Sequence, residues 1–149
     1  MASDATIGWG GEFHLSSNAT EAGLVELSEV TNISGLPDEE TEDVEVTHLK
    51  SPNRRREYIA GFRGTSDVQV TMNYVPGSAS DVLIRAAKDA GDTRALRFVI
   101  PDQTGDPAWE VDTFGYVKGY SRGPISPDGK IEAVVTVRIT GDQTEAAAA

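Results

Sequence analysis

The feature that most constrains the fold is a strict alternation of side chains over residues 131–139. Apolar residues occupy every second position, and a mostly polar set lies between them: Ile131, Ala133, Val135, Val137 and Ile139 against Glu132, Val134, Thr136 and Arg138. Successive side chains of a strand point to opposite faces, so this spacing predicts a strand with one buried and one solvated face. Strands of this kind are typical of antiparallel sheets.

A second segment repeats the pattern over residues 67–74. Its apolar members share one face and its polar members share the other: Val68, Val70, Met72 and Tyr74 against Asp67, Gln69, Thr71 and Asn73. Shorter or less regular patterns predict further strands in residues 7–15, 24–30, 95–100 and 109–117, with a glycine before Tyr116 marking a possible bulge.

One segment, residues 80–90, has the apolar spacing of a helix. Ser80 stands where an N-cap belongs and Gly91 where a helix stops. The apolar stripe comprises Val82, Leu83, Ala86, Ala87 and Ala90. Together these patterns predict a mainly β protein, an antiparallel β-sandwich or barrel with one short flanking α-helix.

Residues 36–64 are different, because they are charged and poor in core residues. Six of the eight residues from Asp38 to Glu45 are acidic, and the sign then reverses at Lys50 and at Arg54, Arg55 and Arg56. We expect a long extended loop here, and loops of this length in a compact domain are usually functional or disordered. We expect one domain over residues 1–141, followed by a flexible tail over residues 142–149.

The overall charge excludes several classes of function. Lys and Arg total 13 against 24 Asp and Glu, which gives a net charge of −11. That excess of acidic groups argues against binding nucleic acid phosphates or an anionic membrane. With no Cys and only two His, no cofactor or metal site is expected, and we interpret His14 as a packed or surface residue. No nucleophile motif is present, so we expect no enzymatic activity.

The order of elements after Ser66 resembles a known family. A strand ending in Val75-Pro76-Gly77 precedes the helix, Gly91-Asp92-Thr93-Arg94-Ala95 follows it, and later strands carry residues 114–117 and 136–141. This order resembles the tail tube proteins of phages with long non-contractile tails, in particular the N-terminal domain of the lambda member. The resemblance is strong from about Ser66 to Gly141 and looser before it.

The resemblance implies a structural virion protein that is assembled in the host cytoplasm. Its subunits would form stacked hexameric rings around a bore through which phage DNA passes without specific binding. The implied partners are further copies of the chain, a tape measure protein inside the tube, and tail tip and tail terminator proteins. The alternatives are a tube protein of a gene transfer agent or related injection machine and, in a different class, a monomeric β-sandwich binding module.

Two sets of residues are candidates for these roles. In the family a long loop between early strands becomes ordered during assembly, and residues 36–64 match it in position and character. We expect its charges to meet across subunits or rings: Asp38, Glu39, Glu40, Glu42, Asp43, Lys50, Arg54, Arg55 and Arg56. We expect the bore to be lined by the polar strand faces, with carboxylates repelling DNA: Asp67, Gln69, Thr71, Asn73, Glu132 and Thr136. Arg138 shares that face and opposes a purely acidic bore.

Overall fold

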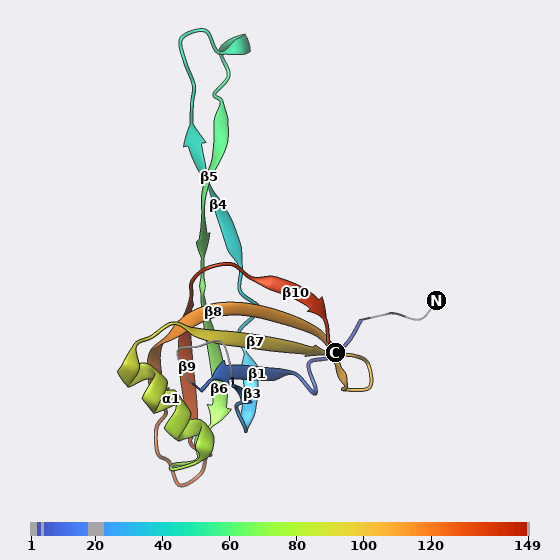
Figure 1. Cartoon of the computed structure of the whole chain (residues 1–149), viewed down its shortest axis with the longest axis vertical. Helices are drawn as coiled ribbons and strands as arrows, with labels where there is room; N and C mark the ends of the chain where they lie inside the picture. The colour runs from blue at the N-terminus through green and yellow to red at the C-terminus, as the bar shows by residue number, and fades with distance from the viewer. Residues whose placement is uncertain (1–2, 4, 18–22, 149) are drawn as a thin grey trace.

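The computed structural model describes residue 3, residues 5–17 and residues 23–148. The described chain is mainly β, with an eight-stranded antiparallel sheet, a separate two-stranded hairpin and one α-helix (Figure 1). The elements are β1 (Glu12–Ser16), β2 (Leu24–Glu26), β3 (Val30–Ile33), β4 (Glu39–Glu45), the 3-10 turn η1 (Pro52–Arg54), β5 (Tyr58–Thr65), β6 (Asp67–Asn73), α1 (Ala79–Ala90), β7 (Arg94–Pro101), β8 (Pro107–Arg122), β9 (Glu132–Ile139) and β10 (Thr144–Ala147).

The large sheet has the strand order β2-β1-β7-β8-β9-β6-β3, with β10 paired to β8. Strand β8 spans 16 residues and belongs to both halves of the sheet. Its first half pairs with β7 and β10 and its second half with β9. Figure 1 shows β1, β7 and the first half of β8 running across β6, β9 and β3, so the sheet folds over on itself as a sandwich.

The core fills the space between the two halves of the folded sheet. Phe13, Leu15, Leu96, Phe98 and Val111 come from one half. The other half contributes the residues that the alternation predicted: Val68, Val70, Met72, Ala133, Val135, Val137 and Ile139. Hydrophobic burial between two one-sided layers is the main stabilising term in such an architecture.

The helix follows the prediction in place but differs in detail. Gly91 ends α1 in the left-handed conformation with φ of 62°, as predicted. The N-cap is Ser78, whose hydroxyl accepts from the Asp81 N–H, whereas the predicted cap Ser80 is buried and its Oγ lies 2.9 Å from the Ser28 N–H. The buried face comprises Ser80, Asp81, Ile84 and Ala87, so the predicted stripe was wrong at Val82, which is 51% exposed, and at Ala86 and Ala90, which are also exposed.

Three further segments differ from the sequence-based expectation. The strand expected over residues 7–15 begins only at Glu12, and Ile7 and Trp9 are exposed. The bulge in β8 falls between Val117 and Gly119 and not at Gly115. Residues Thr144–Ala147, where we expected a flexible tail, form β10 and pair with β8 from Asp112 to Trp109. No helix in the described ranges is long and apolar enough to cross a membrane.

Candidate assembly surfaces

The segment expected as a long loop is a β-hairpin that projects from the sandwich (Figure 1). Strands β4 and β5 pair from Glu39↔Thr65 to Glu45↔Tyr58. Its base is anchored where the Thr65 hydroxyl donates to the Ile139 carbonyl at 2.8 Å. Every residue of β4 is exposed, so the hairpin contributes nothing to the core. An isolated two-stranded hairpin is only marginally stable in water, so this one is suited to being covered by another surface.

The hairpin separates its charges along its length. The acidic candidates, Asp38, Glu39, Glu40, Glu42 and Asp43, lie at its base and along β4. The basic candidates, Lys50, Arg54, Arg55 and Arg56, lie at its tip around η1. None of these four basic residues makes an ion pair with a described residue, and the hairpin's own pairs are Arg63 with Glu39 at 3.6 Å and His48 with Glu57 at 3.4 Å. Among the described residues, the basic tip therefore does not pair with the acidic stem of its own chain.

Exposed apolar side chains on the hairpin are assembly candidates that the sequence analysis missed. Phe62 is 88% exposed, Val44 and Ile59 lie opposite each other in the register, and Leu49 is fully exposed near the tip. Gly61 leaves room for Val44, because a Cβ there would lie 2.8 Å from Val44 Cγ2. Exposed apolar groups close together on a surface favour contact with a partner. The available signal was the apolar residues at 44, 46, 59 and 62 within an otherwise charged segment.

The six residues expected to line the bore lie on one face of the sheet, opposite the core. In the β6–β9 register, Gln69 stands opposite Thr136 and Asn73 opposite Glu132. Asp67 and Thr71 lie on the same side of β6, because Val68, Val70 and Met72 between them are buried. The structure therefore brings all six together as one polar surface, which we call the β6–β9 outer face.

The β6–β9 outer face is mixed in charge, which differs from the expected row of repelling carboxylates. Asp67 is paired with Lys118 at 2.9 Å and with Arg138 at 3.1 Å, and Glu132 lies 3.4 Å from Lys130. The hydrogen bond from Lys118, and to a smaller extent that from Arg138, lowers the pKa of Asp67. Lys118 was missed by sequence reasoning because its contact with Asp67 depends on the strand order β8-β9-β6, which no local pattern gives.

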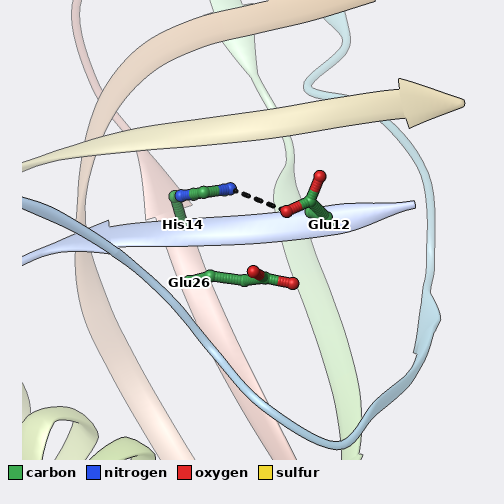
Figure 2. A group of neighbouring side chains, drawn as sticks. All are labelled: Glu12, His14 and Glu26. Atoms are coloured by element: carbon green, nitrogen blue, oxygen red, sulfur yellow. Dashed lines mark ion pairs between the residues drawn. The ribbon is translucent and has the colours of Figure 1, made fainter. Parts of the chain in front are cut away.

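The outer face of the other half of the sheet carries a compact group of Glu12, His14 and Glu26 (Figure 2). His14 stands opposite Glu26 in the β1–β2 register, and its Nε2 lies 3.5 Å from Glu12 Oε1. Partial burial, together with the charge and hydrogen bond of Glu12, raises the pKa of Glu26. The side chain of His14 is half-buried on β1.

The sheet ends in two short edge strands, β2 and β3. Beside β3 lies a groove of about 470 Å³ whose lining includes Trp9, Val30, Leu36 and Phe98. An edge strand leaves backbone N–H and C=O groups unpaired, and these can pair with a strand of another chain. Both ends of the sheet are thus open to extension.

The sequence itself decides the family. Residues 9–146 match the family described as lambda phage tail tube protein. The chain belongs to this family. It is therefore a tail tube protein, a structural component of the virion tail, and the predicted resemblance is confirmed. Comparison with curated protein sequences gives no match.

Solved structures show the same fold at low sequence identity. The tail of an empty gene transfer agent particle matches at 17% identity with a TM-score of 0.72, covering 94% of this chain and 98% of that one. The tail tube of SPP1 matches at 14% identity with a TM-score of 0.67, covering 97% and 80%. The sheath–tube complex of an extracellular contractile injection system, PVC, matches at 7% identity with a TM-score of 0.70, covering 97% and 93%. The tube fold is thus shared across three kinds of particle.

Proposed function

We propose that this tail tube protein is the repeating subunit of a hollow tube made of stacked six-membered rings, through which DNA is ejected. Its chemistry is that of assembly, with no catalytic role. The observation that carries the proposal is the β4–β5 hairpin, a long element that places no side chain in the core of its own chain.

Within a ring, the open edges β2 and β3 are the surfaces suited to joining neighbouring subunits. Rotational symmetry without a dyad makes each contact heterologous, so one surface of a subunit meets a different surface of the next. Pairing of edge strands, or packing of a neighbour into the groove beside β3, would satisfy the groups that are open in the single chain.

Between rings or subunits, the hairpin is suited to carry the contact. Its basic tip and acidic stem lie at opposite ends, so the tip of one subunit can reach the stem of another. Exposed ion pairs contribute only about 0–1 kcal/mol each, so the charges would set register and partner choice more than strength. The exposed Val44, Ile59 and Phe62 supply the apolar area that stabilises the contact.

We assign the bore to the β6–β9 outer face. A conduit should not retain its cargo, and each unpaired Lys or Arg near DNA strengthens binding through counterion release. On this face Lys118, Arg138 and Lys130 are all paired with carboxylates. The tape measure protein would occupy the bore before DNA does, and tail tip and terminator proteins would close the two ends of the tube.

The likeness to the gene transfer agent tail supports the same role in a particle of that kind. Whether the particle is a phage or a gene transfer agent, we expect a tape-measure gene and capsid genes beside the gene for this protein. The alternative of a monomeric binding module predicts a chain that never associates.

Electron microscopy of the purified protein at high concentration, with sedimentation alongside, tests the assembly. We expect rings or tubes with sixfold end views. If the protein stays monomeric, it is mixed with tail-tip and tape measure proteins, which supply an initiator. A chain that fails to polymerise in that mixture as well would contradict the proposal and favour the monomeric binding module.

A further inference from the structure

We propose that Glu12, His14 and Glu26 form a zinc site that fastens the edge strand β2 to β1. The site is separate from the hairpin and from the β6–β9 outer face, and it lies on β2, one of the two edge strands assigned above to contacts within the ring. Figure 2 shows the three side chains gathered on one side of the β1–β2 pair.

The three side chains have their positions set by the backbone. Glu12 and His14 are two residues apart on β1, so they point to the same face, and Glu26 is the cross-strand partner of His14. Strand β1 is hydrogen-bonded to β2 on one side and to β7 on the other, so its side chains are carried by a fixed frame. A preorganised ligand set of this kind loses little conformational entropy when it binds a metal.

The distances fit a tetrahedral metal ion. One ligand atom from each residue lies within 4.8 Å of the other two, and His14 Nε2 lies 3.5 Å from Glu12 Oε1. Two ligands of a tetrahedral zinc ion at about 2.0–2.1 Å from the metal are roughly 3.3 Å apart. A small rotation of the exposed Glu26 side chain closes the remaining gap, which leaves a fourth position for water.

The local charge also calls for a cation. Glu12 and Glu26 bring two carboxylate oxygens to within 4.8 Å of each other, and like charges this close repel each other. The nearest cation across the sheet is Arg97, opposite His14 on β7. Its guanidinium is already bound to Asp112 at 2.7 Å and lies 3.7 Å from Glu110. A divalent ion would neutralise the carboxylates of both Glu12 and Glu26, of which Glu12 has His14 as its ion-pair partner among the described residues.

The donor set selects the kind of ion. Calcium takes six to eight oxygen ligands, which two carboxylates and an imidazole do not supply. Imidazole nitrogen with carboxylate oxygen suits zinc and neighbouring transition metals. Because Glu26 lies on a strand of only three residues at the edge of the sheet, the ion would hold that strand in place.

Zinc binding to the full chain, free of any histidine tag, tests the site. Binding of Zn²⁺ is measured by calorimetry, and the amount retained after desalting is measured by elemental analysis. We expect one ion per chain, and affinity that falls by more than about tenfold in His14→Gln and in Glu26→Gln. Glu26→Gln changes an exposed residue, so it remains informative if the His14 variant folds poorly. Circular dichroism confirms the fold of each variant.

The matched control is His48→Gln. His48 lies 3.4 Å from Glu57, which makes a similar histidine–carboxylate pair without the third ligand. This variant should bind zinc like the parent chain. Hydrogen exchange at residues 24–26 should slow with zinc in the parent chain and in His48→Gln only. Absence of zinc binding by the parent chain, or equal binding by His14→Gln and Glu26→Gln, would overturn the proposal.

Discussion

The Tyr120 hydroxyl donates a hydrogen bond of 2.9 Å to Asp81 Oδ1, which joins the long strand β8 to helix α1. The Asp81 side chain is only 4% exposed. Its other oxygen accepts from the Gly77 N–H at 3.1 Å and lies 3.1 Å from the Arg85 guanidinium. One buried carboxylate therefore holds the start of the helix, the preceding turn and the sheet together.

Replacing Tyr120 with Phe should destabilise the folded chain by about 1–3 kcal/mol, since a hydrogen bond to a buried charged acceptor is lost. The free energy of unfolding in urea measures the effect. Tyr116→Phe on the same strand is the matched control, because Tyr116 is 37% exposed, and it should change stability by no more than about 0.5 kcal/mol. Equal effects of the two variants would show that the Asp81 contact is unimportant.

Acidification should weaken the same junction. Burial alone would raise the pKa of Asp81, but the Gly77 N–H, the Tyr120 hydroxyl and the charges of Arg85 and Arg122 together lower it below 3.8. As the pH falls, the Asp81 carboxyl is therefore protonated in the unfolded chain before it is protonated in the folded chain. The stabilisation that the charged carboxylate gives the fold is present above pH 3.8 and is lost as the pH falls through the folded-state pKa. The free energy of unfolding should fall less steeply as the pH drops below 3.8 in Asp81→Asn than in the parent chain. Parallel curves would contradict this role.

Neutralising Arg54, Arg55 and Arg56 together with Gln should impair tube formation while the subunit stays folded. The three side chains are exposed at the hairpin tip and have no ion-pair partner among the described residues. Neutralising them should therefore leave the stability of the single subunit unchanged. Tube length in electron micrographs and the melting temperature are the two measurements. Lys88→Gln, which removes an exposed charge on α1 away from the hairpin, is the control. Tubes of normal length from the triple variant would rule out a role for the tip.

Adding Lys at Gln69 and Thr71 should slow DNA ejection without blocking assembly. Both residues lie on the β6–β9 outer face, and unpaired cations there would attract phosphates in the bore. Ejection kinetics from particles with intact tails measure the effect, which should weaken as salt is raised. Ala86→Lys combined with Gln103→Lys adds the same charge on other surfaces. Unchanged ejection from particles with intact tubes would remove this face from the bore.

Much of the fold was predictable because its signals are local. The alternation in residues 67–73 and 132–139 assigned each residue correctly to the core or to the outer face. Gly91 correctly marked the end of α1. The N-cap was misassigned to Ser80, because a serine hydroxyl suits either a cap or a buried contact, and only the position of Ser28 decides between them.

The candidate surfaces were less predictable, because they depend on which strands become neighbours. The sequence placed the acidic and basic groups of the hairpin in order but did not predict the pairing of residues 39–45 with 58–65. Exposed strands lack the one-sided apolar pattern from which strands are recognised. The pairing of Asp67 with Lys118 likewise depends on the strand order β8-β9-β6, which no local pattern indicates.

By itself the sequence determined the class of fold, the core faces of the main strands, the family and the uneven charge of residues 38–56, since each is a matter of residue type and short spacing. Tertiary structure alone decided that those charges stand on a projecting hairpin, that the β6–β9 outer face is mixed in charge, and that Glu12, His14 and Glu26 meet. The physical reason is strand register: it brings together residues that are distant in sequence, and it is set by the packing of the whole core.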